Sequence, residues 1–430
     1  MDKISIGLLG LGTVGGGVYQ LLQRDNEAIN RRLGAELVVE KILVSDLKKA
    51  RNHEIDKSLL TADPKDVIDN EEIDIVVELI GGTKVAKELV EAALKKGKSV
   101  VTANKELIAN HGSEIFDLAE SAGVEIDFEA SVAGGIPIIG PLKDSLVGNK
   151  IVKIMGIVNG TTNYILSKMS EGDEYDHALA EAQELGYAER DPSADVSGDD
   201  AGAKIAILSS IAFNSRVTPK EVYTEGITSV SLNDIMYAYE LGYTIKLVAL
   251  AKKRGDELDV RVHPTMISLD HPLAKVDDVY NAIFVVGDAV GELMFFGKGA
   301  GDMPTASAVV GDIFKVAGNL KKEKKCYSTC TCFNSFNVKP IDEVESNFYI
   351  LMEVLDRPGV LAKIAKILGE EGVSLGSVIQ KQSSGNLAEL VFMTHLVREG
   401  NLRSALSKVS DLEDVDRVCN VIRVETGDDG

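Results

Sequence analysis

The chain has 430 residues, with 46 basic and 67 acidic side chains and a formal net charge of −21. Hydrophobic residues make up 45% and charged residues 26%, which excludes a disordered or fibrous protein. An acidic chain without Trp is unsuited to binding nucleic acid or an anionic membrane, and no apolar run reaches membrane-spanning length. Four cysteines are too few for a disulfide scaffold, and the N-terminus does not read as a signal peptide. We therefore expect a soluble, cytoplasmic protein of two or three domains.

The first 130 residues alternate between short apolar runs and amphipathic segments. The apolar runs predict buried strands at Ile4–Leu9, Leu37–Val44, Ile73–Ile80, Ser99–Thr102 and Val124–Phe128. The segments between them predict helices at Val14–Leu22, Lys84–Lys96 and Ser113–Ala122. Strands and helices that alternate in this way form a parallel sheet covered on both faces. The expected fold is α/β, with a Rossmann-like dinucleotide-binding domain.

The turn after the first predicted strand carries the pattern G-L-G-T-V-G. In such a turn Gly10 permits the tight bend, and Gly12 lets the backbone approach a pyrophosphate at the helix N-terminus. Gly15 then lets the helix pack closely on its strand. Because the pattern lies between a strand and a helix, we favour dinucleotide binding over a glycine-rich turn without a ligand.

The end of the second predicted strand bears on which dinucleotide is bound. Asp46 is placed to bind a ribose diol, which favours NAD. Lys48, Lys49 and Arg51 could instead bind the 2′-phosphate of NADP. All four residues could also belong to a solvated loop, so the choice between NAD and NADP stays open.

Polar loops follow the next strands. Glu78–Thr83 ends one strand and Thr102–Lys105 ends another, at the carboxyl edge where doubly wound sheets bind ligands. Lys105 is thus either a contact to substrate or cofactor or an ordinary surface lysine. Glu129 and the loop Ala133–Pro137 could bind a hard cation through one carboxylate and backbone carbonyls, although their spacing alone favours a plain Gly-Pro turn.

The pattern of apolar and polar residues changes after residue 150. We expect a strand at Ile151–Val158, a polar loop at Asn159–Asn163, and helices at Tyr164–Met169 and Asp176–Leu185. A further helix is expected to begin near Ser197, whose side chain can cap its N-terminus.

Two charged residues of that helix carry the chemical argument. Asp200 and Lys204 are four residues apart and share one helix face. An ordinary ion pair would explain them, but Lys204 leads into the apolar run Ile205–Leu208, and a lysine buried there needs a carboxylate partner. Such a lysine beside a nucleotide site is a reasonable proton donor to an alkoxide.

A long gapped pattern spans this segment, formed by Ala182, Gly186, Tyr187, Ala188, Asp191, Pro192, Asp195, Val196, Gly198, Asp200 and Lys204. Together with GLGTVG, VTANKEL, AGGIPII and NGTTNYIL, it resembles the homoserine dehydrogenase signature at every fixed position. The resemblance covers residues 1 to about 320. It implies NAD(P)-dependent interconversion of L-aspartate 4-semialdehyde and L-homoserine, in threonine and methionine biosynthesis.

The same resemblance implies the roles of individual residues. Lys204 matches the proton donor, Glu189 and Asp200 match the homoserine-binding acids, and Lys105 matches a lysine shared by substrate and cofactor. Lys204, Lys105 and Asp200 are therefore the expected catalytic residues. The remaining substrate contacts are Gly160 and Thr161, and the cofactor contacts are Gly10, Gly12, Thr13, Val14, Gly15, Asp46, Thr102, Lys105, Gly186 and Gly301.

Two further properties follow from the resemblance. Glu129, with the carbonyls of Val132, Gly134 and Ile136, matches a monovalent-cation site, for which sodium is the candidate. Many NADP-using relatives have an arginine after the second strand where this chain has Ser45, which argues against tight NADP selectivity.

The C-terminal region contains a linker at 321–347 and a small domain at 348–430. Cys326, Cys330 and Cys332 in the linker lack zinc-ribbon spacing and are interpreted as incidental thiols. The domain is predicted to have the ferredoxin-like order βαββαβ, with strands at Phe348–Val354, Ser374–Gln380, Ala388–Thr394 and Val415–Val424 and helices at Leu361–Glu371 and Asn401–Asp411. Its DRPGVL turn resembles an ACT domain, which implies feedback inhibition by threonine. The alternative is a plain dimerisation domain.

The expected organisation is a dinucleotide-binding domain at 1–130 and about 302–320, an α+β substrate and dimerisation domain at 131–301, and the ACT domain. We expect a homodimer or homotetramer. The leading hypothesis is a regulated homoserine dehydrogenase. The alternatives are a nucleotide- and amino-acid-sensing protein without turnover, and a dehydrogenase of another amino-acid semialdehyde. The triad Glu189, Asp200 and Lys204 favours an enzyme, since a sensor has no need of a proton donor.

Overall fold

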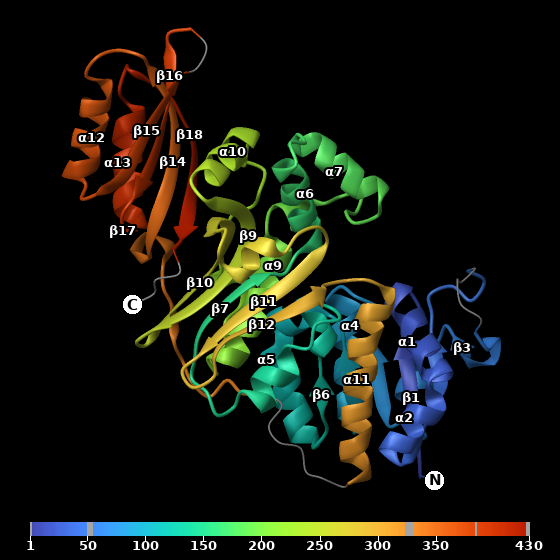
Figure 1. Cartoon of the computed structure of the whole chain (residues 1–430). Coiled ribbons are helices and arrows are strands. Elements are labelled where there is room, and N and C mark those ends of the chain that lie inside the picture. Colours follow the sequence, from blue (N-terminus) through green and yellow to red (C-terminus); the bar gives the residue numbers. More distant parts are fainter. Residues whose placement is uncertain (1, 50–54, 323–329, 383–384, 427–430) are drawn as a thin grey trace. The chain divides into compact units, whose positions relative to one another are not determined.

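The computed structural model describes residues 2–49, 55–322, 330–382 and 385–426 (Figure 1). The chain divides into two compact units, which are described separately. Unit 1 comprises residues 1–152, 203–219 and 281–335, and unit 2 comprises residues 153–202, 220–280 and 336–430. Among the described residues, no helix is long and apolar enough to cross a membrane. The domain boundaries given above stay a prediction.

Unit 1 is built on a parallel sheet with the strand order β3-β2-β1-β4-β5-β6. The central strand β1 (Asp2–Leu9) pairs with β2 (Ala35–Leu43) on one side and with β4 (Ile75–Glu78) on the other. The outer strands are β3 (Leu60–Thr61), β5 (Ser99–Thr102) and β6 (Ile126–Asp127). This is the strand order of a doubly wound dinucleotide-binding sheet, so the predicted fold class is confirmed.

Helices pack against this sheet (Figure 1), namely α1 (Thr13–Arg24), α2 (Asn26–Leu33), α3 (Lys65–Ile68), α4 (Lys84–Lys95), α5 (Lys105–Ala122) and α11 (Asp302–Lys321). The late helix α11 lies against α1, because a Cβ atom at Gly17 would be 3.0 Å from the Cβ of Ala306. Ala306 and Ile313 are fully buried in the same core as Ile6 of β1. The segment after residue 301 therefore packs in the same core as the nucleotide sheet.

Two helices begin earlier than predicted, because an asparagine caps each of them. Helix α5 begins at Lys105 rather than Ser113, since the Asn104 side chain accepts the Leu107 N–H at 3.0 Å. Helix α6 (Gly160–Ser170) begins directly after Asn159, whose side chain accepts the Thr162 N–H at 2.9 Å. The predicted polar loop Asn159–Asn163 is therefore wrong.

Helix α9 (Asp199–Ala212) begins two residues later than the expected start. The residue before it is Gly198, with φ of +87°, so Ser197 does not occupy the cap position that was predicted for it. The polar helix α2 was not predicted because its sequence, NEAINRRL, lacks an apolar stripe.

The other elements of unit 1 are the short helical turns Glu129–Ser131 and Pro141–Ser145, most of β11 (Tyr280–Gly287), and β12 (Gly291–Lys298).

Unit 2 contains a largely antiparallel sheet with the strand order β7-β9-β10-β18-β14-β16-β15. Its first strands are β7 (Ile151–Ile157), β9 (Tyr243–Arg254) and β10 (Glu257–Ser268). A two-residue turn that contains Gly255, with φ of +62°, joins β9 to β10 in a long hairpin. The helices are α6, α7 (Tyr175–Glu184), α8 (Ser193–Val196) and α10 (Leu232–Glu240), and the short strand β8 (Tyr223–Thr224) pairs with β10.

The C-terminal domain has the predicted order βαββαβ. Its elements are β14 (Glu345–Leu355), α12 (Val360–Glu370), β15 (Leu375–Gln382), β16 (Leu387–Thr394), α13 (Glu399–Ser410) and β18 (Val415–Glu425), with the short strands β13 (Asn337–Val338) and β17 (Val397–Arg398) beside them. Phe348, Ile350 and Phe392 lie in its core together with Ile364 of α12.

The last strand of this domain joins the preceding sheet. β18 pairs in parallel with β10, with Thr265 opposite Arg423. The Arg423 guanidinium is buried and donates to Glu399 of α13 at 2.9 Å and to Glu225 at 2.8 Å. Burial of such a cation is tolerated because two carboxylates pair with it.

Candidate active site

The glycine-rich turn between β1 and α1 has the geometry that its sequence predicts. Gly10 has φ of +104°, a conformation that L side chains rarely adopt. A Cβ atom at Gly15 would lie 2.4 Å from the Gly10 carbonyl oxygen, so the close packing of α1 on the turn requires glycine there. A Cβ atom at Gly12 would meet nothing within 4 Å. Gly12 therefore leaves open space at the N-terminus of α1. Thr13 and Val14 lie in the first turn of that helix.

This turn opens into a cavity of about 560 Å³ in unit 1. Gly10 and Gly12 line one part of it, and Ser45, Asp46 and Lys49 line another. Asp46 is exposed, and its carboxylate accepts the Lys48 N–H at 2.7 Å. The cavity is large enough for part of a dinucleotide and presents both an acid and a base, so it does not decide between NAD and NADP. Arg51 lies outside the described residues.

The carboxyl ends of β4 and β5 are joined by a buried acid that sequence reasoning missed. Glu78 is fully buried, and its carboxylate accepts the Thr102 hydroxyl at 2.6 Å. It also accepts the backbone N–H groups of Ile80 and Gly81. Glu78 thereby fixes the loop after β4 and orients Thr102. An acid at the end of the otherwise apolar strand IVVE was the available signal.

Lys105 is the first residue of α5, next to this edge of the sheet. It is half-buried, and the capping residue before it is held on both sides. Asn104 accepts the Leu107 N–H and donates to the Gly82 carbonyl at 2.7 Å. The backbone that carries Lys105 is therefore fixed by hydrogen bonds rather than being part of a free surface loop.

The Glu129 segment is built around its carboxylate. One oxygen accepts the N–H groups of Ile138 and Ile139 at 2.6 and 2.7 Å, and the other accepts the Gly140 N–H at 2.7 Å. The latter oxygen thus keeps one lone pair for a further partner. Ala133 has φ of +55° and Gly134 has φ of +50°, so the intervening loop is sharply bent.

Close packing explains the two glycines of this loop. A Cβ atom at Gly134 would be 2.5 Å from the Gly299 carbonyl oxygen, and one at Gly135 would be 2.8 Å from Pro304. Val132 and Ile136, whose carbonyls were assigned to a cation, are buried on either side. Gly301 belongs to the facing segment and precedes α11 with φ of +125°.

In unit 2, one amide connects two of the acids in the long signature. The Asn159 Nδ2 donates to Asp195 at 2.7 Å and to Asp200 at 2.8 Å, while its Oδ1 caps α6. Asp200 is only 9% exposed, so this hydrogen bond holds a nearly buried carboxylate. Sequence reasoning missed the role of Asn159, because a strand-ending asparagine signals a loop as readily as a cap.

Helix α9 carries Asp200 in its first turn and Lys204 one turn later. Lys204 is half-buried, and Ile205, Ala206 and Leu208 after it are fully buried, as expected from the sequence. A continuous helix therefore fixes the spacing of a carboxylate and an ammonium group. Asp200 and Lys204 are thus an acid and a base that lie one helical turn apart on α9.

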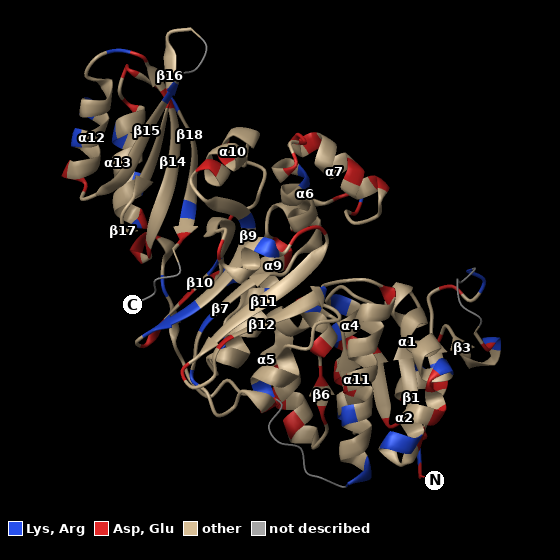
Figure 2. Ribbon diagram, viewed as in Figure 1, with Lys and Arg blue, Asp and Glu red and all other residues tan. Residues whose placement is uncertain are grey.

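The remaining substrate residues lie near the N-terminus of α6 and after α7. Gly160 and Thr161 form the first turn of α6, and the Thr161 hydroxyl donates to the Tyr187 carbonyl at 2.8 Å. Gly186, with φ of +75°, and Glu189 are exposed in the segment after α7. Acidic side chains are frequent on α7 (Figure 2), a surface that suits a substrate with an ammonium group.

The predicted residues are thus distributed over both units. Unit 1 contains the nucleotide turn, Asp46, Thr102, Lys105, the Glu129 segment, Lys204 and Gly301, and unit 2 contains Gly160, Thr161, Gly186, Glu189 and Asp200. The structure joins Asp200 to Asn159 and orders the nucleotide turn. The Glu189 backbone carbonyl accepts a hydrogen bond from the Gln183 side chain at 3.2 Å.

Comparison with known proteins gives a consistent result over almost the whole chain. Residues 10–129 match the family model for the homoserine dehydrogenase NAD-binding domain, residues 137–314 match that for homoserine dehydrogenase, and residues 348–414 match that for the ACT domain. A homoserine dehydrogenase of Synechocystis is 47% identical, over 98% of this chain and 99% of the relative.

Solved structures agree with these matches. A homoserine dehydrogenase from Thiobacillus denitrificans is 43% identical and superposes with a TM-score of 0.93, covering 99% of each chain. A hyperthermophilic archaeal homoserine dehydrogenase in complex with NADPH is 32% identical, with a TM-score of 0.62, covering 74% of this chain and 98% of its own.

Proposed function

This chain belongs to the homoserine dehydrogenase family, and we propose that Lys204 is the proton donor on which its catalysis depends. The enzyme interconverts L-aspartate 4-semialdehyde and L-homoserine with NAD(P). The observation that supports the proposal is the fixed spacing of Asp200 and Lys204 on α9, with Asp200 held by Asn159.

The chemistry requires a cation and a proton at one oxygen. The nicotinamide, when bound, supplies or accepts the hydride at the carbon that bears that oxygen. Reduction of the aldehyde places negative charge on the oxygen, and the Lys204 ammonium group donates a proton to it. In the oxidative direction the Lys204 amine removes the hydroxyl proton. Lys105 acts as the second cation, which stabilises the developing oxyanion.

Carboxylates bind the amino group of the substrate. We assign this role to Glu189 and Asp200, because an ammonium group forms charge-assisted hydrogen bonds with acids. Gly160 and Thr161 lie in the first turn of α6, where backbone N–H groups lack intrahelical partners and can bind the substrate carboxylate.

The residues around the glycine-rich turn fit a dinucleotide. Gly12 leaves space where a Cβ atom would otherwise project, and Gly10, Thr13, Val14 and Gly15 shape the helix N-terminus for the pyrophosphate. Asp46 or Lys49 would contact the ribose. Thr102, Gly186 and Gly301 complete the proposed contacts.

We also propose a monovalent-cation site at Glu129. One Glu129 oxygen keeps a lone pair, and the carbonyls of Val132, Gly134 and Ile136 supply the further oxygens. Exchange of sodium for a large organic cation at constant ionic strength should lower the melting temperature. An unchanged melting curve would argue against the site.

The ACT domain fits a small-molecule effector, and we propose L-threonine.

We further propose that the enzyme acts in the cytoplasm as a homodimer or homotetramer. Free cysteines at 330, 332 and 419 support a reducing compartment. Met294 and Phe296 of β12, which are 42% and 53% exposed, support a subunit interface. Saturating L-threonine should change the rate, and light scattering should give a mass of two or four chains.

Substitution of Lys204 tests the central proposal. Lys204→Ala should lower kcat about 10²- to 10⁴-fold, because a positioned proton donor is lost, while NADPH binding measured by fluorescence stays within about threefold. Lys220→Ala, on an exposed turn after α9, is the matched control and should retain full activity. Normal turnover by Lys204→Ala would refute the role assigned to Lys204.

A further inference from the structure

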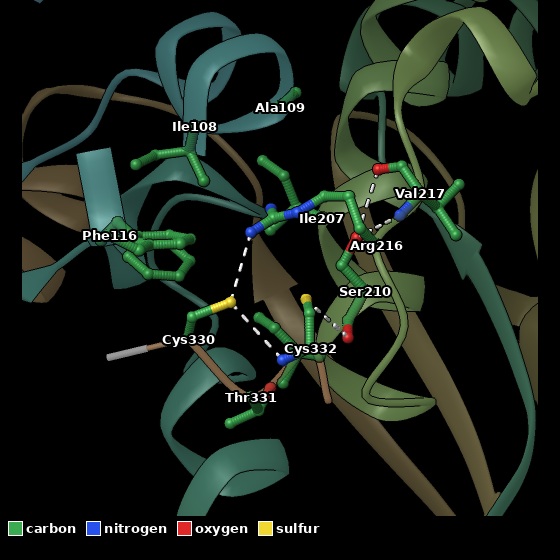
Figure 3. A pocket seen from close by; sticks show the side chains of 12 residues that line it. Ile108, Ala109, Phe116, Ile207, Ser210, Arg216, Val217, Cys330, Thr331 and Cys332 are labelled. Atoms are coloured by element: carbon green, nitrogen blue, oxygen red, sulfur yellow. Dashed lines mark hydrogen bonds between the residues drawn. The ribbon is translucent and has the colours of Figure 1, made fainter. Parts of the chain in front are cut away.

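Two cysteines and an arginine form a cluster in unit 1 that the dehydrogenase chemistry does not use. The Arg216 Nη2 lies 3.3 Å from the Cys330 Sγ, and the Cys332 N–H points to the same sulfur at 3.4 Å (Figure 3). The Cys332 Sγ also lies 3.7 Å from the Ser210 carbonyl oxygen. Cys330 thus accepts hydrogen bonds, whereas Cys332 is fixed as a donor.

Aromatic rings hold the arginine in this position. The Arg216 guanidinium lies over the Phe116 ring at 5.4 Å from its centroid, and Phe116 stacks on Phe128 with the same centroid separation. A cation–π contact of this kind restrains the guanidinium and directs its N–H groups sideways. The cation beside Cys330 is half-buried and is held by these contacts rather than being a mobile surface charge.

The cluster lines a small cavity. Its volume is about 20 Å³, which admits about one water molecule and hence an oxygen atom of a small oxidant. The described residues that line it include no carboxylate, and Ile108, Ile207 and Ile211 are among them. Cys330 is itself only partly buried, so small solutes can reach its sulfur.

Electrostatics favour the thiolate of Cys330. The hydrogen bonds from Cys332 and the charge of Arg216 lower the pKa of the Cys330 thiol to about 6, against the opposing effects of desolvation and Asp117. The pKa of Cys332 is raised, first because of its hydrogen bond to Cys330. Cys419, on β18, has a pKa raised by burial. Among the described cysteines, Cys330 is thus the activated thiol and Cys419 is a matched unreactive one.

We propose that Cys330 is a peroxide-sensitive thiolate whose oxidation to a sulfenic acid lowers the turnover of the enzyme. The oxidant is a small hydroperoxide, in the simplest case hydrogen peroxide. The Cys330 sulfur attacks one peroxide oxygen, an S–O bond forms, and the O–O bond breaks. The sulfur loses two electrons to the peroxide. The departing hydroxide takes up a proton and leaves as water.

The position of the cluster explains the effect on turnover. Helix α5 supplies Ile108 and helix α9 supplies Ile207 to the walls around the sulfur (Figure 3). These helices begin with the segments that carry Lys105 and Lys204. An added polar oxygen, and the lost attraction between Arg216 and a thiolate, would shift both helices. This consequence rests on the roles proposed above for the two lysines, whereas the oxidation does not.

The test uses the full-length enzyme with Cys326→Ser as the common background. After brief treatment with hydrogen peroxide, dimedone labelling and peptide mass spectrometry should find Cys330 modified about tenfold or more faster than Cys419. Arg216→Gln should reduce that labelling several-fold, and Arg216→Lys, which retains the cation, should reduce it less. Initial rates should fall with labelling and recover on addition of dithiothreitol.

The variants separate the two parts of the proposal. Cys330→Ser should keep its basal rate and resist peroxide, whereas Cys419→Ser should remain sensitive. Equal labelling of Cys330 and Cys419 would overturn the assignment of a reactive thiolate. Full labelling of Cys330 with unchanged turnover would overturn the effect on catalysis. Neither result depends on the outcome for Lys204→Ala, so this inference and the proposed mechanism can fail independently.

Discussion

The two glycines at the N-terminus of α1 provide a matched pair of substitutions, because the same added methyl group meets different surroundings. In Gly12→Ala the new Cβ meets nothing within 4 Å. Its φ of −82° suits alanine, so we expect the free energy of unfolding to change by no more than about 0.5 kcal/mol. The methyl group instead occupies the space proposed for the pyrophosphate. Affinity for the cofactor should fall about 10- to 100-fold, which corresponds to about 1.4 to 2.7 kcal/mol.

Gly15→Ala should damage the protein itself. The added Cβ would lie 2.4 Å from the Gly10 carbonyl oxygen, about 1 Å inside an ordinary contact, so α1 must move away from its turn. Overpacking of this size costs about 1–3 kcal/mol, and the better helix propensity of alanine returns about 1 kcal/mol. The net loss of up to about 2 kcal/mol should lower the melting temperature by up to roughly 8 °C.

Differential scanning fluorimetry and fluorescence titration with NADPH would measure both effects on the same samples. Gly12→Ala should melt like the parent and bind poorly, whereas Gly15→Ala should melt earlier. The reasoning would be refuted if Gly12→Ala kept the parent affinity, or if it lost as much stability as Gly15→Ala.

Three further predictions follow from other parts of the molecule. His263 is fully buried, and desolvation together with Arg423 and Arg261 lowers its pKa well below that of an unfolded histidine. The unfolded chain therefore binds an extra proton as pH falls below about 6.5, and the free energy of unfolding drops by up to about 1.4 kcal/mol per pH unit. His263→Gln should reduce the fall of the melting temperature with decreasing pH in this range. An unchanged slope would contradict the assignment. Lys49→Ala should weaken NADP binding about tenfold and leave NAD binding unchanged, as measured by parallel titrations, if Lys49 contacts the 2′-phosphate; equal losses for both cofactors would exclude that contact. Tyr349→Phe should lower the free energy of unfolding by about 1–2 kcal/mol, because the Tyr349 hydroxyl donates to the fully buried Asp234 at 3.1 Å. A melting curve that matches the parent would show that another donor replaces the Tyr349 hydroxyl.

The sequence was sufficient for the parallel sheet and the nucleotide turn, because local signals determine both. Alternating apolar runs specify buried strands, and Gly10 and Gly15 are required by a positive φ and by close packing. Helix starts were less predictable. Asn104 and Asn159 both cap helices, yet an asparagine after a strand fits a loop equally well.

The contacts that complete the site were not predictable from local pattern, because they join distant residues. The Asn159 amide reaches Asp195 and Asp200, and the Glu78 carboxylate accepts the Thr102 hydroxyl. The environment of Cys330 depends on Arg216, which is 114 residues away. The spacing of the cysteines led to their interpretation as incidental thiols. Spacing alone contains no information about a neighbouring guanidinium.

The parallel pairing of β10 with β18 has a practical consequence for any attempt to remove the ACT domain. Truncation before residue 345 would strip β10 of its neighbour at Thr265 and leave Glu225 without the guanidinium of Arg423. A shortened enzyme would then carry an uncovered strand edge and an acid that has lost its cationic partner, and it would tend to aggregate. A deregulated catalyst is better sought by altering the effector-binding surface while the final strand is left intact.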